Sequence, residues 1–156
     1  MEKTLIKGVA KDTSVTRISV VGLEDAPGIA FKLFNVLAQH KVNVDIILQS
    51  IGRDGTKDIT FTVPSDQHDV AVKALESLDG ILQFKNIVAD NDCAKISIVG
   101  AGMESHPGVA SKMFEALFDA GINIHMISTS EIKISVLIDS KYADKAVSAV
   151  HDAFLG

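Results

Sequence analysis

The sequence predicts an α+β protein made of two copies of one folding unit, and two observations carry that prediction. The stretch from Glu24 to Ser50, EDAPGIAFKLFNVLAQHKVNVDIILQS, recurs from Glu104 to Ser130 as ESHPGVASKMFEALFDAGINIHMISTS, at a constant offset of 80 residues. An apolar, strand-like segment also precedes and follows each copy: RISVVG at 17–22, DITFTV at 58–63, KISIVG at 95–100 and KISVLI at 133–138. Strands and helices that stay in phase while loops differ in length are typical of repeated folding units.

Composition narrows the class of protein. At 156 residues and 47% hydrophobic, the chain is long enough for two small domains with a core each. Its net charge of -5 and its lack of Trp argue against a nucleic-acid-binding surface, which needs a basic face. No apolar run reaches the roughly 20 residues of a membrane span. The first residues do not resemble a secretory signal, and the single Cys93 fits a reducing compartment. We therefore expect a cytoplasmic protein with no membrane or nucleic-acid partner.

The first elements follow from local patterning. A short strand at 4–9 is expected to end in a turn at 11–14, and a strand at 15–22 alternates apolar and polar residues. Asp25 is expected to cap the helix that follows, with Pro27 close to its first turn. Apolar residues at helical spacing then form one stripe, made of Ala30, Leu33, Phe34, Leu37 and Ala38. That stripe predicts a helix lying on a sheet.

A hairpin and a second helix complete the first unit. Strands at 43–51 and 58–63 are joined through Asp-Gly at 54–55, a strong hairpin signal. A helix at 66–78 and a strand at 81–88 follow. The resulting order βαββαβ is that of the split βαβ, or ferredoxin-like, sandwich.

The second unit repeats this order but lacks its last strand. Its final helix, at 141–154, is followed by only two residues. The strand at 4–9 has no partner of its own in the first unit, so we expect it to complete the second sheet. The first domain would then be residues 15–90, inserted into a second domain of residues 1–14 plus 91–156.

No known catalytic motif is present in the sequence. Gly100-Ala-Gly102 follows an apolar strand, but the dinucleotide-binding fingerprint needs a third glycine where this chain has Ser105. His106 and His125 have no Cys or acidic cluster at ligand spacing, so surface or capping roles are expected and no metal site is predicted. We therefore expect no catalytic residue and no cofactor in this chain.

The beginning of the first helix has features of a binding site. A Pro-Gly turn ahead of a helix leaves backbone N–H groups free, and the helix dipole favours an anion there. Gly28 lets a ligand approach the backbone, and Ala30 keeps the next turn narrow. Asn43 and Asp45 begin the adjoining strand and could hold an ammonium group. These features suit a free amino acid; the alternative is that Asp25 is only a helix cap and Asn43 only a turn residue.

At these residues the sequence resembles the ACT domain pair of aspartokinases, over essentially the whole chain. The resemblance is carried by DAPGIA and NVDIILQS in the first unit, and by GAGMESHPGVA and INIHMISTSEIKISVLI in the second. Aspartokinases phosphorylate aspartate at the start of lysine and threonine synthesis, and the resemblance covers only their regulatory part. It implies feedback inhibition by lysine, threonine or both, with ATP and Mg²⁺ bound only by the absent kinase domain. It also implies that the chain is either a fragment or a separate small subunit.

The resemblance further implies partners and site residues. ACT pairs of two chains form a homodimer with the effector between unlike units, and the aspartokinase catalytic domain or subunit is the other expected partner. One wall of the effector site would be Asp25, Gly28, Ala30, Asn43, Asp45 and Gln49. The other would be Val109, Ala110, Asn123, Ile124, Ser130 and Glu131. Asp45 or Glu131 suits a lysine ammonium and Gln49 a threonine hydroxyl, whereas Ala110 stands where related sequences often carry threonine. The alternative is a stand-alone ACT-type amino-acid sensor that regulates another protein.

Overall fold

The computed structural model describes residues 6–103 and 106–156, which form two compact units. One unit is Ser14–Asn91, and the other is Asp92–Gly156 together with the described residues of Met1–Thr13. The strands are β1 (Ile6–Glu24), β2 (Ile47–Ile51), β3 (Thr56–Pro64), β4 (Asn86–Gly100), β5 (Met126–Thr129) and β6 (Lys133–Asp139). The α-helices are α1 (Ile29–Gln39), α2 (His68–Glu76), α3 (Gly108–Asp119) and α4 (Ala143–Leu155), with 3₁₀ turns at Ser65–Gln67 and Ser140–Tyr142. The two ferredoxin-like repeats are thus confirmed.

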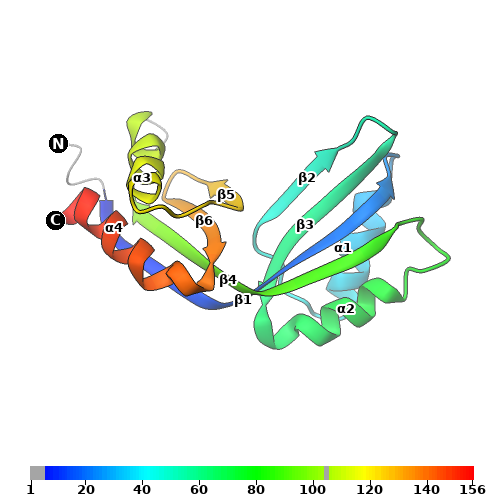
Figure 1. Cartoon of the computed structure of the whole chain (residues 1–156). Coiled ribbons are helices and arrows are strands. Elements are labelled where there is room, and N and C mark those ends of the chain that lie inside the picture. Colours follow the sequence, from blue (N-terminus) through cyan, green and yellow to red (C-terminus); the bar gives the residue numbers. More distant parts are fainter. Residues whose placement is uncertain (1–5, 104–105) are drawn as a thin grey trace. The chain divides into compact units, whose positions relative to one another are not determined.

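Two long strands, β1 and β4, contribute to both units. Ser14–Asn91 has the strand order β2-β3-β1-β4, and the other unit has the order β1-β4-β6-β5 (Figure 1). The turn expected at 11–14 is wrong, because β1 continues without a break from Ile6 to Glu24. The strands expected at 81–88 and 95–100 are also not separate, since β4 runs from Asn86 to Gly100. Residues 10–14 are exposed and polar or small, so no apolar alternation marks them as a strand.

The core of Ser14–Asn91 lies between its sheet and the two helices α1 and α2. Residues of the expected helical stripe, Leu33 and Leu37, are fully buried against Ile18 of β1 and Phe61 of β3. Ile18 and Phe61 are also partners in the antiparallel β1–β3 register. The Phe34 ring meets Phe61 edge-on, with centroids 5.6 Å apart. One face of this sheet is therefore covered by helices, as the amphipathic spacing predicts.

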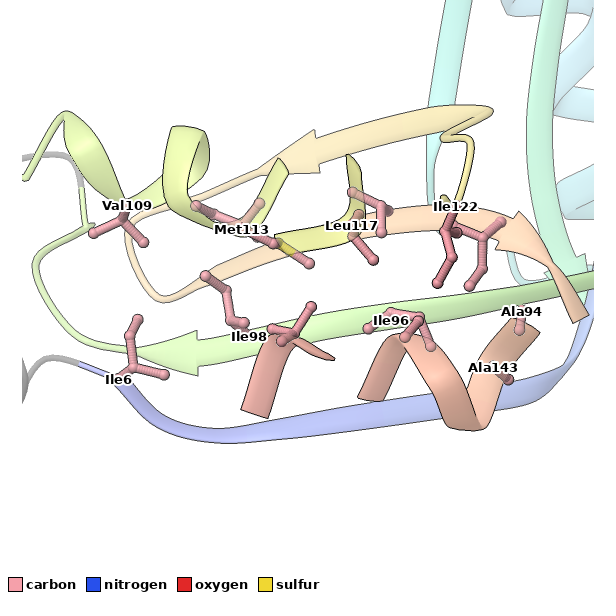
Figure 2. Packing of buried hydrophobic residues seen from close by; sticks show 14 of the residues in the cluster. Ile6, Ala94, Ile96, Ile98, Val109, Met113, Leu117, Ile122 and Ala143 are labelled. Atoms are coloured by element: carbon pink, nitrogen blue, oxygen red, sulfur yellow. The ribbon is translucent and has the colours of Figure 1, made fainter. Parts of the chain in front are cut away.

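The N-terminal strand completes the second unit, as expected. Ile6 is 4% exposed and belongs to the same core cluster as Ile98, Met113 and Leu117 (Figure 2). The Lys11 ammonium also pairs with the carboxylate of Asp144 in α4. The rest of that expected strand, residues 4–5, lies outside the described residues. No helix within the described ranges combines the length and the apolar character needed to cross a membrane.

The ends of α1 and α3 differ in a way that predicts a stability change. Gly121 follows α3 at φ 72°, whereas the corresponding residue after α1 is Lys41, at φ 59°. A left-handed conformation costs a residue with a Cβ about 1–2 kcal/mol, and glycine avoids that cost. Lys41→Gly should therefore raise the free energy of unfolding by up to about 1 kcal/mol in urea denaturation, after the entropy cost of glycine.

A matched substitution separates this effect from lysine removal in general. Lys73 lies inside α2, where glycine is expected to cost about 1 kcal/mol. If Lys41→Gly destabilises the protein as much as Lys73→Gly does, the left-handed turn is not a source of strain.

Candidate functional site

The N-terminus of α1 is not capped by a side chain. Gly28 occupies the N-cap position at φ 87°, no side chain bonds to the first turn, and that turn has no acidic residue. The expectation that Asp25 caps the helix is therefore wrong. The first N–H groups of a helix have no intrahelical acceptor. Gly28 is exposed and Ala30 is partly buried, so this N-terminus is reachable from solvent.

Asp25 instead pairs with a lysine that the sequence reasoning missed. The Lys57 ammonium lies 3.6 Å from Asp25 Oδ1, and the two side chains are 7% and 37% exposed. The Asp25 N–H also donates to the carbonyl of Gly55 at 3.1 Å. Lys57 was recognisable, because in β3 it is in phase with the buried Ile59 and Phe61. The two contacts tie the β1–α1 loop to the β2–β3 hairpin.

The remaining residues of the first predicted wall lie along β2 and the segment before it. Asn43, Asp45 and Gln49 are all exposed. The Asn43 N–H donates to Gln67 Oε1 at 2.8 Å, and the Asp45 N–H donates to the Thr62 carbonyl at 3.0 Å.

The strand in this wall is shorter than expected. It was predicted from residue 43, but β2 begins at Ile47. The Ile46 N–H donates to the Thr62 hydroxyl at 3.0 Å, so a side chain interrupts the regular ladder at this point.

The first wall has two parts, the beginning of α1 and the segment that leads into β2, and both pack against one core. Ala30 from the beginning of α1 and Val44 from the segment before β2 both pack against the core cluster of Ser14–Asn91. Gln49 is paired with Ile59 across the β2–β3 ladder. Gln49 therefore points toward the helix-covered side of the sheet, the same side as α1.

The second predicted wall lies entirely in the other unit. Val109 of α3 is buried in the core cluster there, and Ala110 and Ile124 are partly buried against it. Exposed residues complete the set: Asn123, Ser130 and Glu131. The Asn123 amide oxygen accepts the Ile124 N–H at 3.0 Å, and the Ser130 hydroxyl donates to the Lys133 carbonyl at 3.3 Å. Glu131 is in the segment that joins β5 to β6.

Both walls are associated with a strand at the edge of its sheet. β2 is the outer strand of Ser14–Asn91, and β5 is the outer strand of the other unit. The edge strands expose apolar side chains, with Ile47 54% and Ile127 49% exposed. An outer strand also has one row of backbone groups without a partner in its own sheet, which makes it a template for pairing with another chain.

The histidines of the second unit have local partners. His106 Nδ1 lies 3.0 Å from the Gly102 carbonyl and donates to it, while His125 Nε2 lies 3.0 Å from Asp139 Oδ1. In the described part of the chain, no group of three His, Cys, Asp or Glu residues is arranged to hold a metal ion.

Comparison with known proteins matches both units to one family. A model of the ACT domain matches residues 18–78 and 96–154. The aspartokinase of Mycolicibacterium smegmatis is 49% identical over an alignment of 156 positions that covers 99% of this chain. The chain spans only 37% of the length of that aspartokinase.

Solved structures show the same match. The ligand-free regulatory subunit of aspartate kinase from Thermus thermophilus has a TM-score of 0.92 and 41% identity, covering 96% of this chain and 99% of that one. The structure of aspartokinase alpha and beta subunits contains a chain with a TM-score of 0.89 and 42% identity, covering 96% of this chain and 98% of that one. The protein therefore belongs to the ACT domain family, as an ACT domain pair that corresponds to the regulatory part of aspartokinases and not to their catalytic domain.

Proposed function

We propose that this chain senses lysine, threonine or both, and transmits feedback inhibition to an aspartate kinase catalytic domain or subunit. The observation that carries the proposal is the beginning of α1, where Gly28 leaves the helix without a side-chain cap. The Ile29 N–H donates to the Ala26 carbonyl at 3.4 Å. The N–H groups of the next two residues and the helix dipole favour the carboxylate of an amino acid at this position. The family supplies the choice of lysine and threonine, because aspartokinase acts at the start of their synthesis.

The amino group of the effector requires an acceptor beside that helix N-terminus. The exposed carboxylate of Asp45 lies in the segment before β2, whose Val44 packs on the same core as Ala30. In this proposal Asp45 accepts the ammonium, and Gln49 bonds to a threonine hydroxyl. A charged hydrogen bond contributes more than a neutral one, so a small zwitterion can be held by few contacts.

The edge strands support a site shared between two copies of the chain. One wall lies beside β2 in one unit, and the other wall lies beside β5 in the other unit. Both strands are outer strands with exposed apolar residues. A homodimer that joins β2 of one copy to β5 of its partner would bury both edges and bring unlike walls together. An effector bound between the copies would then favour one arrangement of the dimer, which is how a ligand shifts an equilibrium.

The expected affinity is that of a metabolite sensor. Three or four hydrogen bonds to charged groups, at about 1.5–3 kcal/mol each, are set against an association cost of at least about 4 kcal/mol. The difference is about 0.5–8 kcal/mol, and the upper half of that range corresponds to dissociation constants of roughly micromolar to millimolar.

Thermal melting with millimolar L-lysine or L-threonine tests the proposal. We expect at least one of them to raise the melting temperature by several degrees and to increase the dimer fraction in sedimentation velocity. At about 100 times the dissociation constant, ligand binding stabilises the folded state by about 2.7 kcal/mol. D-threonine and D-lysine at the same concentrations are the controls. Absence of a shift with both L-enantiomers would contradict amino-acid sensing by this chain.

The contribution of Asp45 is tested by a substitution in the same experiment. Asp45→Ala should weaken binding of the active amino acid about tenfold, because one charged hydrogen bond is lost. Glu76→Ala is the control, since Glu76 is an exposed carboxylate at the end of α2. Equal affinities in Asp45→Ala and Glu76→Ala would remove Asp45 from the site.

A further inference from the structure

A second candidate site is a pocket of about 410 Å³ beside the β2–β3 turn, within Ser14–Asn91. We call it the hairpin pocket. Its lining includes Gly22, Ser50, Arg53, Asp54, Asp58 and Lys85. Its volume falls in the range of small-molecule sites.

The hairpin pocket opens on the face of the sheet away from α1 and α2. Ser50 is paired with Asp58 across the β2–β3 ladder, while its neighbour Gln49 is paired with Ile59. Ile59 is 1% exposed and belongs to the core under the helices. Successive residues of a strand point to opposite faces, so Ser50 and Asp58 point away from that core. The hairpin pocket is thus separate from the wall that contains Gln49.

Two cationic side chains, Arg53 and Lys85, line the hairpin pocket, and the aliphatic part of Lys85 is packed against the backbone. The Lys85 N–H donates to the Val21 carbonyl at 2.8 Å. The stem of Lys85 packs so closely on Gly22 that an added Cβ would lie 2.7 Å from Lys85 Cγ. Gly22 is also at φ 75°, a conformation that favours glycine. The Lys85 ammonium lies close enough to Asp54 to contribute to the lowered pKa of that carboxyl, and among the described residues the Arg53 guanidinium has no hydrogen bond or salt bridge.

Two carboxylates also line the hairpin pocket. Asp54 Oδ1 accepts the Thr56 hydroxyl at 2.6 Å and the Thr56 N–H at 3.2 Å, and these bonds lower the pKa of Asp54 below its usual value. Asp58 Oδ1 accepts the Gly22 N–H at 2.9 Å. These bonds orient both groups through Oδ1. An ionised carboxylate has acceptor capacity for several donors, so the second oxygen of each can still accept a bond from a ligand.

The balance of charge indicates the class of ligand. Arg53 and Lys85 contribute two positive charges, and Asp54 and Asp58 contribute two negative charges. A simple anion would be repelled by the carboxylates, and a simple cation by the basic groups. A ligand with both charges gains from both pairs. We propose that the hairpin pocket binds a small zwitterion, a free α-amino acid, with its carboxylate on Arg53 and Lys85 and its ammonium on Asp54 and Asp58.

This site differs from the one in the proposed function and does not rest on it. All its residues belong to one unit of one chain, so no partner copy is needed. The Ser50 hydroxyl is a neutral group in the lining that could bond to a polar side chain of the ligand.

Amide chemical shifts measured by NMR on the ¹⁵N-labelled chain test the proposal. Each of the twenty standard amino acids is titrated in turn at constant ionic strength and pH, with acetate and methylammonium as single-charge probes. Gly52 and Thr56 also line the hairpin pocket. We expect saturating shifts of the Gly22, Gly52 and Thr56 amides with at least one amino acid. Acetate and methylammonium at the same concentration should leave these amides unshifted. Equal shifts with acetate, or no saturating shift with any amino acid, would overturn the proposal.

Substitutions in the lining locate the binding. Arg53→Gln and Asp54→Asn each remove one charge, and the amide introduced by Asp54→Asn would retain an oxygen for the bonds from Thr56. Each should weaken binding about tenfold, the usual effect of losing one charged hydrogen bond. Lys73→Gln on the exposed side of α2 is the control and should change nothing. Unchanged affinity in both lining variants would place the ligand elsewhere.

The same titration separates the two proposed sites. Asp45→Ala should weaken binding at the helix N-terminus but leave the shifts of Gly22 and Thr56 unaltered. Arg53→Gln should have the opposite pattern. A loss of hairpin-pocket shifts in Asp45→Ala would show that the shifts are transmitted from the other site, which would contradict the inference.

Discussion

Removal of residues 1–12 is expected to unfold the second unit while Ser14–Asn91 remains folded. The second unit would lose Ile6 from its core, the bond between Lys11 and Asp144, and the part of β1 that borders β4. Truncation of a buried isoleucine to alanine alone costs about 2–5 kcal/mol. A small domain is stable by about 5–15 kcal/mol in total, so loss of a whole edge strand is severe.

Hydrogen–deuterium exchange measures this outcome for each unit separately. Amides of α3 and α4 should lose protection in the truncated protein, whereas amides of α1 and α2 should keep it. The full-length Ile6→Ala variant is the control, because it removes the side chain and retains the strand backbone. We expect an intermediate loss, confined to α3 and α4. Equal loss of protection in all four helices would show that the two units unfold as one.

Loss of the Asp25 carboxylate is expected to destabilise Ser14–Asn91 through Lys57. The Lys57 side chain is only 7% exposed, so Asp25→Ala would leave its ammonium without its carboxylate partner. Breaking a fully buried pair costs about 3–5 kcal/mol, and the exposure of Asp25 reduces the expected loss to about 1–3 kcal/mol. Urea denaturation of the variant gives this difference.

A double substitution tests the cause of that loss. Lys57→Met removes the buried charge but retains most of the apolar stem, so the Asp25→Ala/Lys57→Met protein should recover much of the lost stability. Glu76→Ala, at an exposed carboxylate, is the reference for a change without such a pair. If Asp25→Ala lowers the free energy of unfolding no more than Glu76→Ala does, the buried Lys57 ammonium is sufficiently solvated without Asp25.

The repeat and the amphipathic helices were predictable because their signals are local. Leu33 and Leu37 in α1, and Met113 and Leu117 in α3, lie at helical spacing and are fully buried. The completion of the second sheet by Ile6 was also predictable, since one repeat lacked a strand and the N-terminal segment had no partner. Periodicity and element counting need no knowledge of contacts between distant residues.

The role of Asp25 was not predictable from local signals. Asp-Ala-Pro-Gly before an apolar stripe is the pattern of an N-cap, but the structure pairs Asp25 with Lys57, which is remote in sequence. The late start of β2 has a similar cause, because the Thr62 hydroxyl accepts the N–H of Ile46. In both cases a side chain from another strand competes with the local interaction.

The sequence by itself determined the two units, their helices and the helix N-termini that make the first candidate site, because each depends on neighbours a few residues apart. Only the tertiary structure decided the continuity of β1, whose residues 10–14 have no buried face to mark them. It also decided the hairpin pocket, since Gly22, Ser50 and Lys85 meet only when β1, β2 and the segment before β4 are folded together. Charges that are distant along the chain form a site only when the sheet brings them together.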